Sequence, residues 1–495
     1  MRLPSVACPT AVRADSTFVS GWSKDRHTLY IGTHVIFPRA IFPRNETAVK
    51  EPIISVSGLR GVVGESLSPE LAMRFACAFV GGLDAGPLVV TRDSRNTGAM
   101  LADAVRSGLA AVGRNVLDAG IAATPTTGVL IRQHQAAGGI QISASHNPSP
   151  YNGLKLFSQA GSVLTSAAGQ DVIQRYRGGE VAWVAFDQIG EILQPPEVNK
   201  KHLELVLATV DVQRIRHRHY KVVLDSNHGV GSLLGLELLH QLGCDVVRLG
   251  DIPDGKFSHA PEPTAENLAS VCQTIIDAVA DIGFCQDPDA DRLALIDHTG
   301  HYIGEEYTLV LCLDHVLASH PGPIVTNCAT SRMAQDLANK YGVPFYRSAV
   351  GEANVVAEMQ EHEAAFGGEG NGGPIDPRVG FVRDSFVGMA LLLDGLATRQ
   401  TSLRDWVATI PSYAIHKTKV PLDREALASG QEAIRAHFAD AEPNDQDGLR
   451  LDWPDRWLLI RASNTEPIAR IIAEAPHQDD AVQLCDEAAG VLAKA

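Results

Sequence analysis

The chain's fold is constrained most by a pattern that occurs three times: a short apolar strand, an amphipathic helix, a glycine and a second short strand. Each glycine follows a predicted helix, where a residue with positive φ is needed and glycine adopts it at the lowest cost. A helix between two strands favours parallel or mixed sheets covered by helices. The pattern therefore predicts three related α/β domains. The three segments are 88–117, 222–247 and 324–346, with helices over about 99–112, 233–242 and 331–341, each ending at Gly113, Gly243 or Gly342.

The end of the chain follows another plan. Residues 457–461 and 469–473 are predicted strands, and residues 481–494 a terminal helix. Since no helix connects the two strands, we expect a smaller α+β domain here, and 495 residues are enough for four domains. Residues 1–51 show no strand or helix period, and we expect a disordered extension. The predicted domains are 52–195, 196–297, 298–400 and 401–495.

Charge and cysteine usage exclude several classes of protein. The net charge of −16 would repel a polyanion, so we expect no nucleic acid partner. A small anionic substrate then requires a local gathering of Arg and Lys. The eight cysteines are scattered without a C-x-x-C pair, which indicates neither a zinc cluster nor a disulfide framework. No apolar run is long enough to cross a membrane, so we expect a cytoplasmic protein with no membrane partner.

A serine loop is the first motif with chemical potential. The apolar run 138–142 predicts a buried strand, and the residues after it, 143–153, are rich in Ser, Asn, Pro and Gly and predict a tight loop. Within this loop lie Ser145 and His146, with Lys155 just beyond it. A serine on a rigid loop after a buried strand suits nucleophilic or phosphoryl-carrying chemistry. From this motif alone, an ordinary turn is equally possible.

An aspartate triplet is the second motif. Asp287, Asp289 and Asp291 follow one another at every second position, so in an extended segment they would point to one side. Carboxylates crowded in this way repel each other unless a cation neutralises them, and Mg²⁺ is the hard cation that fits. A calcium-binding EF-hand loop is excluded, because Arg292 and His298 stand where that loop needs Gly and Glu.

A glycine-rich loop over residues 366–373 surrounds Glu369 and Asn371. Glycine lets a ligand approach the backbone closely. Glu369 would repel phosphate and no Lys-Ser/Thr pair follows, so a phosphate-binding loop is disfavoured. A carboxylate and an amide suit sugar hydroxyls or an amino group instead. A flexible linker is the alternative, and Phe366 before the loop and a predicted helix over 385–396 after it argue against one.

The last motif gathers donors for an anion. Residues 461–467 include Arg461, Ser463, Asn464 and Thr465, and Arg470 follows. These groups suit a dianionic phosphate, with Arg binding two oxygens at once. The alternative is a helix N-cap, which the strand predicted at 469–473 leaves little room for. Arg60, Arg92 and Arg95 also lie near predicted turns, and each alone is typical of an exposed surface residue.

These four motifs, in this order, resemble those of the α-D-phosphohexomutase family, and the match runs from about Pro52 to the C-terminus. The resemblance implies four domains around a central cleft: three related mixed α/β domains and a smaller α+β C-terminal domain. One loop from each would contribute to the site.

The resemblance also implies a role for each motif. Ser145 would be a phosphoserine that stores the transferable group, and its oxygen would complete a Mg²⁺ site. The cation ligands would be Asp287, Asp289 and Asp291. Lys155 and Arg60 would take part in proton transfer, with His146 beside the phosphoserine and Arg292 facing the phosphoryl group. Glu369 and Asn371 would bind sugar hydroxyls. The other phosphate of the substrate would be held by Arg461, Ser463, Asn464, Thr465 and Arg470.

The implied reaction interconverts hexose 6-phosphate and hexose 1-phosphate through a hexose 1,6-bisphosphate. The glycine-rich loop looks most like that of the phosphoglucosamine mutase branch, which favours glucosamine 6-phosphate as the small-molecule sugar phosphate partner. We expect the protein to be a monomer or a homodimer. Gly373 stands where many members have His, so proton transfer would rest on Lys155, Arg60 and His146. Phosphomannomutase or phosphoglucomutase activity, a Mg²⁺-dependent phosphatase and an inactive sugar-phosphate-binding protein are the alternatives.

Overall fold

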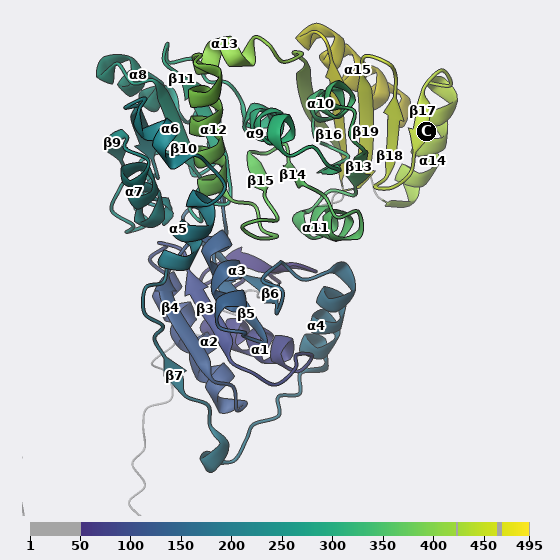
Figure 1. Cartoon of the computed structure of the whole chain (residues 1–495). Coiled ribbons are helices and arrows are strands. Elements are labelled where there is room, and N and C mark those ends of the chain that lie inside the picture. The colour runs from purple at the N-terminus through teal and green to yellow at the C-terminus, as the bar shows by residue number, and fades with distance from the viewer. Residues whose placement is uncertain (1–50, 422–423, 463–467, 495) are drawn as a thin grey trace, which may run out of the picture. The chain divides into compact units, whose positions relative to one another are not determined.

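The computed structural model describes residues 51–421, 424–462 and 468–494, and the extension predicted over 1–51 lies outside them except for Glu51. Four sheets follow one another along the chain, in the strand orders β1-β2-β6-β5-β3-β4-β7, β11-β10-β8-β9, β13-β12-β14-β15 and β16-β20-β19-β18-β17. The first three mix parallel and antiparallel pairs, and the fourth is wholly antiparallel. This confirms the predicted fold class, with three mixed α/β domains and a different C-terminal domain (Figure 1).

The first sheet is buried on both faces. One face packs on α1, α2 and α4 through a cluster that includes Phe75, Leu101 and Val172, and the other packs on α3 through Leu130, Ile131 and Phe157. The strands are β1 (Ile53–Ser55), β2 (Gly58–Val62), β3 (Leu88–Arg92), β4 (Val116–Ile121), β5 (Gly138–Ile142), β6 (Tyr151–Ser158) and β7 (Ile192–Leu193), and the helices α1 (Pro69–Val80), α2 (Gly98–Ala111), α3 (Thr124–Gln133) and α4 (Ser166–Gly178), with a 3₁₀ turn over Phe186–Gln188.

The second and third sheets repeat the strand-helix-strand unit. The predicted glycines Gly113, Gly243 and Gly342 all have positive φ, at +80°, +74° and +66°, as a helix end requires. The second sheet and the helices of its domain are α5 (Lys200–Leu207), α6 (Val212–Arg216), β8 (Lys221–Asp225), α7 (Gly231–Gln241), β9 (Asp245–Leu249), α8 (Ala269–Ala278), β10 (Ile282–Gln286) and β11 (Leu293–Asp297). The third sheet and the helices that accompany it are α9 (Glu305–Ser319), β12 (Ile324–Asn327), α10 (Met333–Tyr341), β13 (Phe345–Ser348), α11 (Glu352–Glu361), β14 (Phe366–Glu369), β15 (Gly373–Ile375), α12 (Ser385–Arg399) and α13 (Leu403–Val407).

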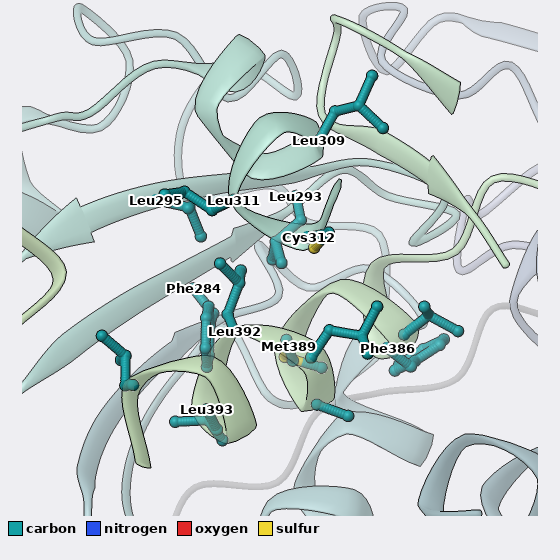
Figure 2. Close-up of a cluster of buried hydrophobic side chains, with 14 of the residues drawn as sticks. Phe284, Leu293, Leu295, Leu309, Leu311, Cys312, Phe386, Met389, Leu392 and Leu393 are labelled. Atoms are coloured by element: carbon teal, nitrogen blue, oxygen red, sulfur yellow. The ribbon is translucent and has the colours of Figure 1, made fainter. Parts of the chain in front are cut away.

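The second and third sheets share one hydrophobic core. Helices α9 and α12 pack against each other, and their side chains meet those of β10 and β11, as Figure 2 shows for Phe284, Leu311 and Leu392. Leu403 and Trp406, which the sequence predicts to belong to the last domain, are part of the same cluster. Burial of this much apolar surface keeps the loop after β10 and the hairpin β14–β15 in a fixed relation.

The fourth sheet is covered on one face by two helices, through Ile434, Phe438 and Leu484. Its elements are β16 (Ala414–Pro421), α14 (Arg424–His437), β17 (Glu442–Asn444), β18 (Leu449–Asp452), β19 (Trp457–Ala462), β20 (Ile468–Ala475) and α15 (Gln478–Leu492). In the described part of the chain no helix has the length and hydropathy of a membrane span.

Candidate active site

Ser145 lies in the loop that connects β5 to β6, with 1% of its surface exposed. Its backbone has φ +50°, a left-handed conformation that is rare for residues other than glycine. The Ser145 N–H donates to Ser143 Oγ at 2.9 Å, and Ser143 Oγ donates to Asp93 Oδ2 at 2.7 Å. Because backbone strain persists only where surrounding contacts enforce it, this serine is held in one position.

Arg95 donates most of the side-chain hydrogen bonds that hold the Ser145 loop in place. Its guanidinium donates to the carbonyl oxygens of Ser145 and Asn147 at 2.6 Å each, and to those of Pro148 and Tyr151 at 2.9 and 3.1 Å. Its Nε donates to Asp93 at 3.1 Å. A single buried cation therefore binds four carbonyls of the Ser145 loop, which only the planar fork of arginine can do.

The aspartate triplet forms a tight turn, and the prediction of an extended segment was wrong. Asp287 Oδ1 accepts from the backbone N–H groups of Asp291 and Arg292, both at 3.1 Å, and Ala290 has φ +58°. These side-chain-to-backbone bonds favour a turn over an extended strand. The three carboxylates still converge, with one oxygen of each within 4.8 Å of the others.

The donor set fits a divalent cation. All three aspartates are fully buried, and Oδ1 of Asp289 and Oδ1 of Asp291 accept no hydrogen bond from any residue that the structure describes. Burial and the charges of Asp291 and Asp289 raise the pKa of Asp287 well above its usual range. Buried oxygen ligands with surplus negative charge are what Mg²⁺ requires. Ser145 Oγ donates to Asp287 Oδ2 at 2.9 Å, so the serine adjoins this site.

Two residues from the first domain also reach the triplet. Lys155 Nζ, on β6, donates to Asp289 Oδ2 at 2.5 Å and to Asp291 Oδ2 at 2.8 Å. Thr124, the first residue of α3, donates its hydroxyl to Asp289 Oδ2 and its N–H to the Asp289 carbonyl. Burial alone would lower the pKa of Lys155, but Asp289 and Asp291 outweigh it and the pKa is raised, so Lys155 is an ammonium.

The other residues of the predicted catalytic group are His146, Arg60 and Arg292. His146 Nδ1 lies 3.3 Å from Ser145 Oγ, and burial, with Arg292 and Arg60 nearby, lowers the pKa of His146 to about 3. Its imidazole is therefore neutral at physiological pH. Arg60 Nη1 donates to Asn147 Oδ1 at 3.2 Å. Arg292 Nε is buried, 3.9 Å from Asp291 Oδ1, and makes no hydrogen bond within the described chain.

The glycine-rich segment is a β-hairpin, with Glu369 at the end of β14 and Asn371 in the turn. Gly372, at φ +80°, approaches the start of β11 so closely that a Cβ would lie 2.4 Å from the Leu293 carbonyl. The Gly372 carbonyl accepts a hydrogen bond from Leu293 N. The Glu369 carboxylate accepts from Asn327 Nδ2 at 2.8 Å and from Arg383 Nη1 at 2.9 Å. Asn371 Oδ1 is buried without a partner among the described residues.

Two acids stand at the start of α9, and one of them, Glu306, lies against the hairpin at Gly370. Glu306 accepts from Ser331 N at 3.0 Å, and a Cβ on Gly370 would lie 2.0 Å from its carboxylate. Glu305 Oε1 is buried with no partner in the ranges described. Burial raises the pKa of both carboxyls to about 7, against the opposing charges of Arg292 at Glu305 and of Lys417 at both.

Arg461 and Arg470 lie on the C-terminal sheet. They face each other across β19 and β20, and Lys419 on β16 is the next residue in the same row. Directly opposed residues of antiparallel strands point to one face, so three cations gather at this end of the sheet. Arg461 Nε lies 3.0 Å from Asp447 Oδ2. Ser463, Asn464 and Thr465 lie outside the described residues.

The structure thus joins the serine loop, the aspartate triplet and the glycine-rich hairpin, whereas no hydrogen bond or ion pair among the described residues links them to Arg461 or Arg470. Sequence reasoning missed Thr124, Arg383 and Lys419 and left Arg95 as a surface residue. The sequence held one signal for Arg95: it stands two positions after Asp93, and both lie shortly after the predicted strand that begins at Leu88.

Comparison with known proteins agrees with this geometry. The chain matches four successive models of phosphoglucomutase/phosphomannomutase: alpha/beta/alpha domains I, II and III over residues 52–181, 200–300 and 304–413, and the C-terminal domain over 418–491.

Individual relatives match over most of their length. A phosphoglucomutase/phosphomannomutase of Thermococcus kodakarensis is 36% identical over 433 residues, which cover 86% of this chain and 94% of that protein. A "Probable phosphoglucosamine mutase" of Methanopyrus kandleri is 32% identical over 435 residues, covering 87% and 95%. A crystal structure of a phosphoglucomutase/phosphomannomutase family protein from Burkholderia thailandensis superimposes with a TM-score of 0.77 at 27% identity, covering 89% of this chain and 98% of that one.

These matches span all four domains, and the aspartate triplet supplies the oxygen ligands that a Mg²⁺-dependent family needs. The chain therefore belongs to the phosphoglucomutase/phosphomannomutase family of α-D-phosphohexomutases and is an intramolecular phosphotransferase.

Proposed function

We propose that the chain carries a phosphoryl group on Ser145 and uses it to interconvert glucosamine 6-phosphate and glucosamine 1-phosphate through the 1,6-bisphosphate. The observation that carries this proposal is the contact of Ser145 Oγ with Asp287 at 2.9 Å, on a triplet with two free buried oxygens. A phosphoserine here would add anionic oxygens next to the cation site. When bound, Mg²⁺ supplies positive charge that neutralises the phosphoryl oxygens.

The surrounding side chains suit the transfer. The bond from phosphorus to Ser145 Oγ breaks as the bond to a sugar hydroxyl oxygen forms, the hydroxyl loses its proton, and Ser145 Oγ gains one. Neutral His146, 3.3 Å from Oγ, can accept a hydrogen bond from the serine hydroxyl, and charged Lys155 can donate a proton. The free Nε of Arg292 can bind the moving group. Arg60, through Asn147, orients the loop.

We assign the sugar to the hairpin and the second phosphate to the C-terminal sheet. Glu369, Asn371 and the free carboxylate oxygen of Glu305 suit hydroxyls and an ammonium group. The row Lys419, Arg470 and Arg461 suits a dianion, and Ser463, Asn464 and Thr465, which follow Arg461 in the sequence, would add hydroxyl and amide donors. Relatives named phosphoglucosamine mutase support the amino sugar. The 36% identity to a phosphoglucomutase/phosphomannomutase favours glucose or mannose phosphate as the second candidate.

The test is a comparison of kcat/KM on glucosamine, glucose and mannose 6-phosphates with Mg²⁺ and catalytic hexose 1,6-bisphosphate. We expect the highest value for glucosamine 6-phosphate, and a dominant rate on another sugar would favour the second candidate. Ser145→Ala should abolish turnover. A Mg²⁺-dependent phosphatase would instead release free phosphate and keep its rate in that variant.

A further inference from the structure

Arg383 connects the aspartate triplet to the glycine-rich hairpin directly. Its Nη2 donates to Asp291 Oδ2 at 2.8 Å, and its Nη1 donates to Glu369 Oε2 at 2.9 Å. Glu352 Oε2 lies 3.3 Å from its Nε. Arg383 is 7% exposed and Asp291 is fully buried, so water screens these charges little. One guanidinium therefore divides its charge among three acids.

The two main partners of Arg383 have different tasks. Asp291 belongs to the cation site, and its Oδ2 is also bound by Lys155, which leaves Oδ1 for the cation. Glu369 belongs to the hairpin that faces the sugar in the proposed function. In a buried network, a bond that strengthens on one side of a shared donor weakens the bond on the other side. Binding of a ligand at one loop must then change the affinity for a ligand at the other loop.

We propose that Arg383 is a positioning residue that couples sugar binding at Glu369 to cation affinity at Asp291; this inference rests on the proposed function for both loops. A hydrogen-bond donor of the sugar that reaches the Glu369 carboxylate weakens the bond between Glu369 and Arg383. The bond between Arg383 and Asp291 then becomes stronger. The strengthened Arg383–Asp291 pair then competes with the cation. By linkage, the cation changes the affinity for the sugar by the same factor.

The experiment measures Mg²⁺ binding to the dephosphorylated full-length protein by calorimetry, without and with saturating glucosamine 6-phosphate. The ratio of the two dissociation constants is the coupling factor. We expect this factor in Arg383→Gln to differ at least threefold from that of the wild type. The matched control is Arg378→Gln. Arg378 lies five positions before Arg383 and also pairs with a buried carboxylate, that of Asp376. Its factor should equal that of the wild type.

Equal factors in the wild type and Arg383→Gln would overturn the inference while leaving the proposed function intact. A wild-type protein that binds no glucosamine 6-phosphate would overturn both. Should Arg383→Gln not fold, as judged by circular dichroism, Arg383→Lys takes its place. Lysine keeps the charge without the fork, so its factor should also depart from the wild-type value, and an unchanged factor would contradict the inference.

Discussion

The position of Ser145 depends on one residue 50 positions away in the chain. Arg95 binds four carbonyls of the Ser145 loop, and Phe257 of the second domain stacks 5.1 Å from its guanidinium. Lysine has the same charge but cannot reach four acceptors from one nitrogen.

We therefore expect Arg95→Lys to lower kcat at least tenfold and the free energy of unfolding by about 2–4 kcal/mol. Arg92→Lys is the matched control, because within the described residues the Arg92 side chain makes a single hydrogen bond, at 3.5 Å to the Asp93 carbonyl, and it should stay close to wild type. Steady-state kinetics and urea unfolding measure both effects. Equal losses in the two variants would contradict the role given to Arg95.

Glu306 gives a pH-dependent prediction. Burial raises its pKa in the folded state to about 7, above the value of about 4.5 for the unfolded chain. The folded state therefore binds the extra proton, and the associated stability is present below pH 4.5 and lost as pH rises through 7. Between pH 5 and pH 8, the wild type should lose about 2 kcal/mol relative to Glu306→Gln in urea unfolding.

An exposed acid serves as the reference for this experiment. The Glu432 side chain is 77% exposed, so the stability of Glu432→Gln relative to wild type should not change over the same pH range. A pH-independent difference for Glu306→Gln as well would show that Glu306 is already ionised in the folded protein.

What the sequence reveals of the site follows from how its residues are spaced. Ser145 with His146, and the three aspartates, are neighbours in the chain, so their chemistry could be predicted. Arg383 lies 92 positions from Asp291, and Thr124 lies 165 positions from Asp289. Such pairs meet only because the domains pack, and single residues of these types are ordinarily surface or capping residues.

At the scale of elements, strand and helix positions were predictable and turn geometry was not. Periodicity and the helix-ending glycines locate the β-α-β units because both are local properties. The turn at Asp287 and the hairpin around Glu369 depend on side-chain bonds to backbone groups and on contact with Leu293. Hydrophobic pattern carries no information about these bonds.

The end of α8 offers a stability prediction. Val279 ends this helix at φ +52° and is 82% exposed, whereas α4 and α10 end in the same left-handed conformation at Gly179 and Gly342. A β-branched residue is strained in this conformation and gains little from packing. Val279→Gly should therefore raise the free energy of unfolding by about 1 kcal/mol, and Val279→Ala by less, because alanine keeps its Cβ. Thermal unfolding tests the order, which a destabilised Val279→Gly would contradict.

At the scale of the whole molecule, the site exists because three domains meet at the aspartate triplet. Ser145 and Lys155 reach it from the first domain, while Ser385 Oγ donates to the Ala290 carbonyl at 2.7 Å from the third. The shared core of α9 and α12 fixes the second and third domains around it. Number and type of domains followed from the sequence, but these contacts between domains did not.

Intact-protein mass spectrometry shows whether Ser145 is the phosphoryl carrier. After incubation of the full-length protein with glucosamine 1,6-bisphosphate and Mg²⁺, we expect a gain of one phosphoryl group per chain. Ser145→Ala should gain none, and the wild-type group should be lost on addition of glucosamine 6-phosphate. A wild-type mass that never changes, or a phosphoryl group that persists in Ser145→Ala, would show that Ser145 is not the carrier.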